Sequence, residues 1–205
     1  MSPKTIPDIV VSRLPWYLQA LERMLRSGQK TTSSKEIGEK VGVSDAQIRK
    51  DLSHFGEFGK QGTGYAIPYL IEQLQSILKL DRRWDIAVIG AGDLGHAIAR
   101  YQSFSSHGFS VAAIFDNAPQ KIGMQIGDLT VLDYQQMPEV VQRMSIRMAM
   151  LTVPSKVAQE VADDLVKAGI CAILNYTPVP LNLPSTIQVQ YVDPIVKLQH
   201  MSYYL

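Results

Sequence analysis

The sequence predicts an α/β protein built from two parts, a helical first part and a second part with a parallel sheet. Up to residue 84, apolar residues recur at helical spacing. From Trp84 onward, short apolar runs alternate with helical stretches, as a parallel sheet with crossover helices requires. The net charge changes sign at the same place. Residues 1–84 contain 13 Lys and Arg and 9 Asp and Glu, whereas residues 85–205 contain 7 Lys and Arg and 10 Asp and Glu. A basic part joined to an acidic part indicates two modules with different partners.

Composition excludes several classes of protein. The 205 residues are 46% hydrophobic and 19% charged, which predicts a folded chain with a buried core. The net charge of +1 excludes a protein that covers nucleic acid with a uniformly basic surface, but it is compatible with a local basic patch. The single cysteine, Cys171, excludes a disulfide scaffold and a cysteine-rich zinc site. With no signal peptide after Met1 and no run of 18 apolar residues, we expect a cytoplasmic protein without a membrane partner or a metal.

The first part should contain several short helices. We expect a helix over residues 8–27 that is kinked or divided at Pro15, because proline cannot donate to the preceding turn. Ser33 and Glu36 have the spacing of a capping box, and they should open a second helix that ends at Gly42.

A third helix follows closely and makes a helix-turn-helix candidate with the second. It opens at a second capping box, residues 44–47, and runs through His54. Its inner stripe consists of Ile48, Leu52 and Phe55. The opposite face carries Ala46, Gln47, Lys50, Ser53 and His54, with Arg49 on the flank. Gln can pair with adenine and Lys with guanine or phosphate, so this face suits a major groove; the alternative is a solvated helix face.

Two neighbouring features fit the same interpretation. Ser33 and Ser34 lie at a helix N-terminus, where a DNA phosphate would find free N–H groups. Residues 55–65 contain four glycines and Lys60, so they should form a hairpin or flexible loop that could act as a wing in the minor groove. A further helix should begin at Pro68 and run to about residue 80.

The second part has the pattern of strands and helices in alternation. The predicted strands are residues 86–89, 111–115, 148–151 and 170–174, and the helices between them include residues 94–101, 134–144 and 157–167. The G-x-G-x-x-G motif follows the first strand and opens a helix; its residues are Gly90, Ala91, Gly92, Asp93, Leu94 and Gly95. Asp116 ends the next strand, 21 positions after Gly95. This context predicts a dinucleotide site, with the pyrophosphate at the helix N-terminus and Asp116 on the adenosine ribose.

Asp116 also predicts which dinucleotide binds. A ribose 2′-phosphate beside this carboxylate would bring two anions together, and unit charges about 4 Å apart repel by roughly 4 kcal/mol at an effective dielectric near 20. The next residues are Asn117, Ala118 and Pro119, so no arginine follows closely. We therefore expect NADH and NAD⁺ rather than their phosphorylated forms. The alternative is a glycine turn in an ordinary α/β domain, with Asp116 as a surface carboxylate.

Several segments, in order along the chain, carry a resemblance to one known family. Residues 48–56 read IRKDLSHFG, which resembles VRKDLSYFG, the recognition helix of the Rex family of redox-sensing transcriptional repressors. The resemblance covers the chain from about Ile6 to its end. Three further segments match: residues 62–65 (GTGY), 151–154 (LTVP) and 169–178 (GICAILNYTP). The resemblance implies homodimers with an N-terminal winged helix, a Rossmann domain and a C-terminal helix swapped into the partner. It also implies repression that NADH relieves, and double-stranded operator DNA as the partner.

The resemblance also implies roles for individual residues. The recognition-helix contacts would be Arg49, Lys50, Ser53 and His54, and the wing would comprise Lys60, Gly62, Gly64 and Tyr65. The cofactor site would add Tyr101, near the nicotinamide, and Thr152, Val153 and Pro154. Arg13 and Asp193 resemble a pair that responds to the ligand state. His54 stands where the family usually has Tyr, and Pro194 stands where it commonly has a bulky apolar residue.

These expectations give three domains and leave two other functions open. The winged helix would span residues 1–82, the NAD(H)-binding domain residues 83–192 and the dimerisation helix residues 193–205. One alternative is an NAD-dependent oxidoreductase, but none of the four histidines lies in a recognisable catalytic motif, so we expect no enzyme activity and no catalytic residue. The other is a nucleotide- or CoA-binding module whose helical domain binds protein.

Overall fold

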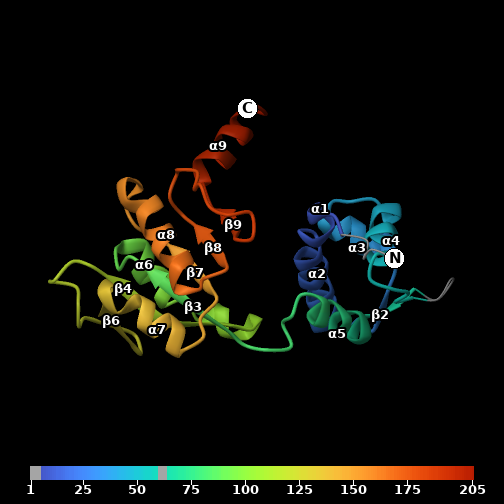
Figure 1. Ribbon diagram of the computed structural model, residues 1–205. Helices are drawn as coiled ribbons and strands as arrows, with labels where there is room; N and C mark the ends of the chain where they lie inside the picture. Colours follow the sequence, from blue (N-terminus) through green and yellow to red (C-terminus); the bar gives the residue numbers. More distant parts are fainter. Residues whose placement is uncertain (1–5, 60–63) are drawn as a thin grey trace. The chain divides into compact units, whose positions relative to one another are not determined.

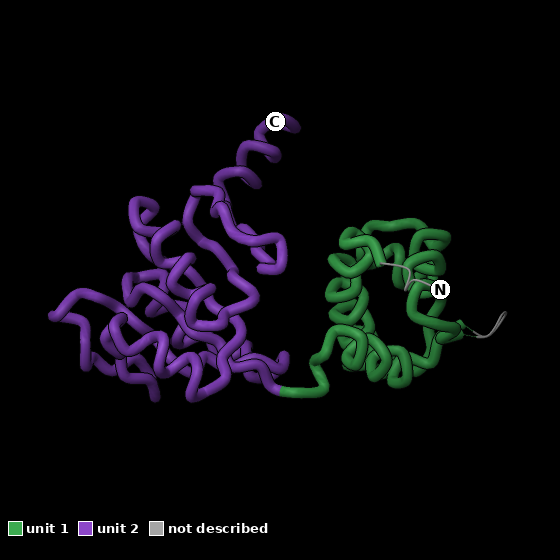
Figure 2. Tube along the Cα trace, viewed as in Figure 1, with its two compact units in different colours: residues 1–82 green, residues 83–205 purple. Residues whose placement is uncertain are grey.

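The chain divides into two compact units, Met1–Arg82 and Arg83–Leu205 (Figure 2). The computed structural model describes residues 6–59 and 64–205. The first unit is helical, and the second is built on a mostly parallel sheet, so the predicted α/β class is confirmed (Figure 1). Each unit has a hydrophobic core of its own.

Helices make up most of the described first unit. They are α1 (Asp8–Val11), α2 (Leu14–Arg26), α3 (Ser34–Val41), α4 (Asp45–Ser53) and α5 (Ile67–Ile77). The predicted division near Pro15 is present as the break between α1 and α2. Strands β1 (Thr31–Thr32) and β2 (Tyr65–Ala66) pair antiparallel, so the chain just before α3 is held against the end of the glycine-rich segment. Helix α5 ends at Ile77, three residues before the predicted end.

One apolar core joins α2, α3, α4 and α5. Leu14 and Leu21 from α2 are fully buried against Ile48 of α4 and Leu74 of α5. The helix-turn-helix corner is tight, because a Cβ on Gly38 would collide with the carbonyl oxygen of Val43. The corner therefore depends on a glycine within α3 that the helical pattern alone did not single out.

The caps of α3 and α4 differ. At α3 the predicted capping box is complete: the Ser33 hydroxyl accepts the Glu36 N–H at 3.2 Å, and the Glu36 carboxylate accepts the Ser33 N–H at 3.0 Å. At α4 the Ser44 hydroxyl accepts the Gln47 N–H at 3.2 Å. The Gln47 side chain does not return the bond; it donates to Asp51 instead. The second predicted box is thus only half formed.

The sheet of the second unit has the order β5-β6-β4-β3-β7-β8-β9 among the described residues. Its strands are β3 (Trp84–Ile89), β4 (Phe109–Asp116), β5 (Gln125–Ile126), β6 (Leu129–Asp133), β7 (Met148–Leu151), β8 (Ala172–Asn175) and β9 (Gln188–Tyr191). All neighbours run parallel except β5 and β6. Strands β5, β6 and β9 were not predicted, because short strands near a sheet edge lack a continuous apolar run. From β3 the chain builds outward first through β4 and then through β7, so the strand order reverses beside β3.

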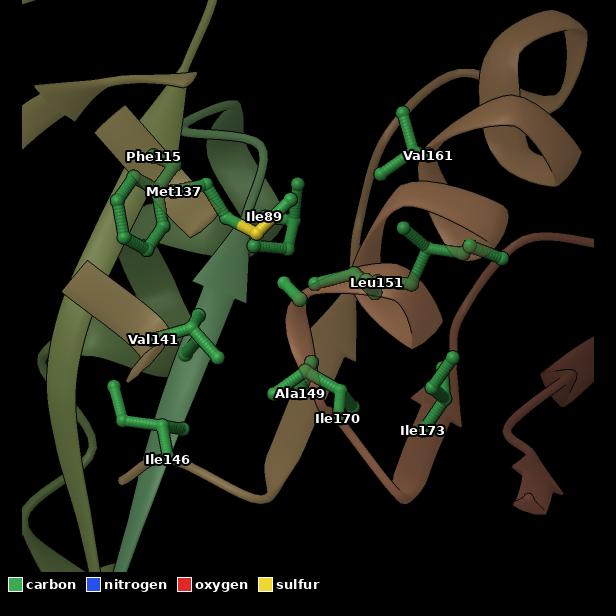
Figure 3. Close-up of a cluster of buried hydrophobic side chains, with 14 of the residues drawn as sticks. Ile89, Phe115, Met137, Val141, Ile146, Ala149, Leu151, Val161, Ile170 and Ile173 are labelled. Carbon is green, nitrogen blue, oxygen red and sulfur yellow. The ribbon is translucent and has the colours of Figure 1, made fainter. Parts of the chain in front are cut away.

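Helices cover both faces of this sheet. Alternate residues of β3 point to opposite faces: Val88 packs with Ile98 of α6 (Asp93–Ala99), and Ile89 packs with the other cluster. That second cluster lies between the sheet and helices α7 (Met137–Arg143) and α8 (Ala158–Ala168) (Figure 3). Short 3₁₀ turns precede both helices, at Tyr134–Gln136 and Ser155–Val157.

The last helix, α9 (Pro194–Ser202), exposes apolar side chains. Asp193 caps it by accepting the Ile195 N–H at 2.9 Å. Its exposed apolar residues are Ile195, Val196, Leu198 and Met201, each more than half exposed. Within residues 6–59 and 64–205, no helix combines the length and the apolar character needed to cross a membrane.

Candidate functional site

A crevice opens at the carboxyl ends of β3, β4 and β7, where the strand order reverses. In open α/β sheets this is where ligands bind. The crevice has a volume of about 730 Å³. It brings together the predicted residues Gly90, Gly92, Asp116, Thr152, Val153 and Pro154. The rest of its lining is Ile89, Asn117, Ala118, Lys121, Tyr134, Val157, Glu160 and Val161.

The glycine loop, residues 90–95, is tightly packed where it meets α6 and open where it faces the crevice. A Cβ on Gly95 would collide with the Gly90 carbonyl oxygen, so this glycine lets α6 lie close to the loop. A Cβ on Gly92, by contrast, would meet no atom within 4 Å. The Thr152 hydroxyl donates to the carbonyl oxygens of Ile89 and Gly90 at 2.9 Å each, which fixes the loop against the end of β7. The loop therefore leaves room for a ligand beside Gly92.

Asp116 is held by donors from both sides of the crevice. Its side chain is 8% exposed. Oδ2 accepts the Ala91 N–H at 2.7 Å and the Lys121 Nζ at 3.1 Å, and Oδ1 accepts the Ala118 N–H at 2.9 Å. Burial raises the pKa of Asp116, but the hydrogen bonds from Ala118, Ala91 and Lys121 outweigh it, so the pKa lies below its ordinary value. The group is a carboxylate at neutral pH.

Other predicted cofactor residues lie outside the crevice lining. Ala91 is buried and acts through its backbone N–H, while Gly95 is buried under the loop. Asp93 and Leu94 are the first residues of α6, and Leu94 is exposed. Tyr101 is exposed as well and packs edge-on against Phe104, with ring centroids 5.1 Å apart. None of these five residues is part of the crevice wall.

Sequence reasoning missed four polar residues that line the crevice: Asn117, Lys121, Tyr134 and Glu160. Lys121 lies five residues after Asp116, in a turn where its N–H donates to the Ala118 carbonyl oxygen at 2.9 Å. Tyr134 donates to Asp164 at 3.2 Å, and burial, with the nearby Asp164 and Glu160 carboxylates, raises the pKa of its hydroxyl. A basic residue soon after the acidic strand end was the available signal for Lys121.

In the first unit, the predicted DNA-contacting residues gather partly around one hollow. It has a volume of about 670 Å³ and lies between α4 and the start of β2. The predicted residues that line it are Ser33, Ser34, Arg49, Ser53, Gly64 and Tyr65. Arg49 donates to Ser34 at 2.9 Å and to Asp45 at 2.7 Å, which ties α4 to the N-terminus of α3. Lys60 and Gly62 lie outside the described residues.

The outer face of α4 is exposed as predicted, with one exception. Lys50, Ser53 and His54 are exposed, and His54 is the residue that caps the C-terminus of α4. Gln47 is only partly exposed, because its side-chain amide donates to Asp51 at 2.6 Å. As placed here, Gln47 supports the helix and does not present a free amide to a base.

Asp51 is a fully buried carboxylate that the apolar stripe of α4 did not reveal. It accepts hydrogen bonds from Arg13 at 2.6 and 2.8 Å, from Tyr17 at 2.6 Å and from Gln47 at 2.6 Å. Burial raises the pKa of Asp51, yet the bonds from Arg13, Tyr17 and Gln47 outweigh it, and its pKa lies below the ordinary value. The same carboxylate and burial raise the pKa of the Tyr17 hydroxyl. This cluster joins α4 to α2.

Arg13 and Asp193, the predicted switch pair, lie in different units. Within the first unit Arg13 pairs with Asp51, and within the second Asp193 caps α9. Both side chains therefore have partners within their own units. The switch itself stays a prediction.

Comparisons with known proteins decide the family. Residues 5–53 match the family model described as "Putative DNA-binding protein N-terminus", and residues 81–179 match the model described as "CoA binding domain". The redox-sensing transcriptional repressor Rex of Chloroflexus aurantiacus is 48% identical over 199 residues, which cover 97% of this chain and 94% of that protein. Rex of Desulforamulus reducens is 43% identical over 205 residues, covering 100% of this chain and 98% of the relative.

This chain belongs to the Rex family. Solved structures of RSP, a Rex-family repressor, are similar in fold to this chain. RSP in complex with NAD⁺ and operator DNA matches with a TM-score of 0.93 and 40% identity, covering 98% of this chain and 93% of that one. RSP in complex with NADH matches with a TM-score of 0.89 and 40% identity, covering 98% and 95%.

Proposed function

We propose that this Rex-family protein is a transcriptional repressor that binds operator DNA and senses the ratio of NADH to NAD⁺. The observation that carries the proposal is the Asp116 carboxylate at the end of β4, which is hydrogen-bonded to the glycine loop at Ala91 and lines the same crevice as Gly92. It stands in the same chain as a helix-turn-helix whose outer face bears exposed basic residues. A sensor of this kind needs both sites in one chain.

The crevice suits a dinucleotide with free ribose hydroxyls. Gly92 is the N-cap of α6, and a Cβ at Gly92 would meet no atom within 4 Å, so a pyrophosphate could approach the N-terminus of this helix. Asp116 would accept a hydrogen bond from the adenosine ribose. The match to a CoA-binding model leaves coenzyme A as a second candidate. Coenzyme A carries a phosphate on its ribose, however, and that phosphate would face the Asp116 carboxylate.

Operator DNA would be read by α4 and the segment leading into β2. Lys50 and Arg49 supply positive charge on and beside the exposed face of α4, and the N-terminus of α3 supplies N–H groups for a phosphate. In the RSP complex, the related protein is bound to operator DNA together with NAD⁺. We propose that NADH releases this protein from DNA.

A homodimer would place two such helices on two half-sites. The support for a dimer is α9, whose exposed apolar side chains are unusual for a helix at the surface of a monomer. We infer that α9 packs on a second copy of the chain. A repressor of this kind acts on the chromosome, so we place it in the cytoplasm, and we assign it no catalytic residue.

Fluorescence anisotropy of a labelled DNA duplex tests the proposal. The duplex would be selected by the protein from a random-sequence pool and titrated at a fixed salt concentration, because phosphate contacts make affinity salt-dependent. At constant total dinucleotide, the affinity for DNA should fall as the NADH fraction rises. Coenzyme A at the same concentrations should have little effect. Equal DNA affinity at all NADH:NAD⁺ ratios would refute the sensor function.

A further inference from the structure

A lysine shares the carboxylate that the adenosine ribose should use. The Lys121 Nζ lies 3.1 Å from Asp116 Oδ2, and its side chain is 34% exposed where it lines the crevice. The chain from Asp116 to Lys121 is a turn fixed by two bonds, Ala118 N–H to Asp116 Oδ1 and Lys121 N–H to the Ala118 carbonyl. The lysine is therefore directed to this carboxylate by the backbone, and not merely near it in sequence.

The acceptor capacity of Asp116 is nearly used up by the protein itself. A carboxylate has about four acceptor positions, two on each oxygen. Among the described residues, Ala91 and Lys121 occupy Oδ2, and Ala118 occupies one position on Oδ1. One position remains for a ligand. A ribose that places both of its hydroxyls on Asp116 must displace Lys121, because the two backbone donors belong to fixed turns.

Lys121 also changes the net charge that a ribose 2′-phosphate would meet in the crevice. Taken alone, Asp116 would repel a ribose 2′-phosphate strongly. Lys121 offsets that charge at a distance of 3.1 Å, and an ammonium group moved off the carboxylate would reach an added phosphate. The crevice thus contains both an acceptor for a hydroxyl and a cation for a phosphate.

We propose that Lys121 is a specificity-determining residue of the dinucleotide crevice: it competes with the ribose for Asp116 and narrows the preference for a 2′-hydroxyl over a 2′-phosphate. The proposal deepens the proposed function and rests on it. Lys121→Met, which keeps the alkyl stem and removes the charge, should make the pocket more selective for NADH over NADPH.

Calorimetric titration of both dinucleotides into three variants tests this. In Lys121→Met the ratio of the NADPH to the NADH dissociation constant should rise about 3- to 5-fold, as expected for a partly exposed charge pair. Lys121→Arg keeps the charge and should keep the wild-type ratio. The matched control is Lys167→Met, because Lys167 is a more exposed lysine that pairs with Asp164 in α8, and neither residue is part of the crevice lining.

The possible outcomes separate the two proposals. If the wild-type protein binds NADH and Lys121→Met leaves the ratio unchanged, the role of Lys121 is refuted and the sensor function stands. The same conclusion follows if Lys167→Met changes the ratio as much as Lys121→Met. If the folded wild-type protein binds neither dinucleotide, both proposals fail.

Discussion

Arg13 and Asp51 form a two-pronged ion pair, with Nε to Oδ2 at 2.6 Å and Nη2 to Oδ1 at 2.8 Å. The pair joins the start of α2 to the last turn of α4, 38 positions along the chain. Asp51 is fully buried and Arg13 is one-fifth exposed. The helix that should read DNA is therefore positioned from its inner side by a charge, in addition to its apolar stripe.

Replacing Asp51 should destabilise the first unit. Asp51→Ala leaves the Arg13 guanidinium without its partner and the buried Tyr17 hydroxyl without its acceptor, which should lower the free energy of unfolding by about 3 kcal/mol. Urea unfolding followed by circular dichroism measures this. Asp45→Ala, which removes an exposed partner of Arg49 on the same helix, should have a much smaller effect. Equal losses in the two variants would contradict the role given to Asp51.

The stabilisation from Asp51 should depend on pH. Its pKa is lower in the folded than in the unfolded chain, so the contribution is complete above the unfolded pKa of about 4 and is lost as the pH falls through the folded pKa. The difference in unfolding free energy between wild type and Asp51→Ala should stay constant from about pH 7 to 5 and shrink below about pH 4. If the difference in unfolding free energy grows as the pH falls, the pKa of Asp51 is not lowered by folding and this prediction is wrong.

Alanine substitutions at Gly92 and Gly95 should have different effects. Gly92→Ala meets open space and should fold normally, but its methyl group would lie where a pyrophosphate passes, so NADH affinity should fall about ten-fold or more. Gly95→Ala forces a methyl group against the Gly90 carbonyl and should cost about 2 kcal/mol or more of stability. Thermal unfolding and NADH titration of both variants separate the effects. If Gly92→Ala is as unstable as Gly95→Ala, the open side of the loop is misassigned.

Lys50→Ala should weaken DNA binding and leave NADH binding unchanged. Lys50 is exposed on α4, in the unit that does not contain the glycine loop. If it contacts a phosphate, the slope of log affinity against log salt should fall by about one; if it contacts a base, the loss should be about 1–3 kcal/mol with relaxed specificity. Anisotropy at several salt concentrations distinguishes these results. Lys167→Ala is the control, and unchanged DNA affinity in folded Lys50→Ala would remove this lysine from the interface.

The predicted switch pair is best tested at Asp193. Because Arg13 also holds Asp51, Arg13→Ala would disturb the first unit as well as any switch. Asp193→Asn removes the charge while asparagine still caps α9. By linkage, NADH and operator DNA must weaken each other by the same factor. If Asp193 pairs with Arg13 in one state, this factor should fall several-fold in Asp193→Asn. A full coupling factor in the variant would leave Asp193 as a helix cap only.

The family, the α/β class and much of the dinucleotide loop could be predicted from the residues alone. These follow from local patterns: a capping box at Ser33 and Glu36, a left-handed glycine at Gly42, and G-x-G-x-x-G between an apolar strand and a helix. Such features are encoded within a few residues, because backbone geometry and helix ends are settled by near neighbours.

The partners of the buried carboxylates, in contrast, are apparent only in the folded structure. The sequence pattern assigned Asp51 to neither face of α4, yet its buried carboxylate accepts hydrogen bonds from Arg13 and Tyr17. The sequence shows that a lysine follows Asp116 by five positions, but only the turn after β4 shows that Lys121 reaches the Asp116 carboxylate. A carboxylate can be buried only where donors from distant segments converge on it, and no local pattern records that convergence.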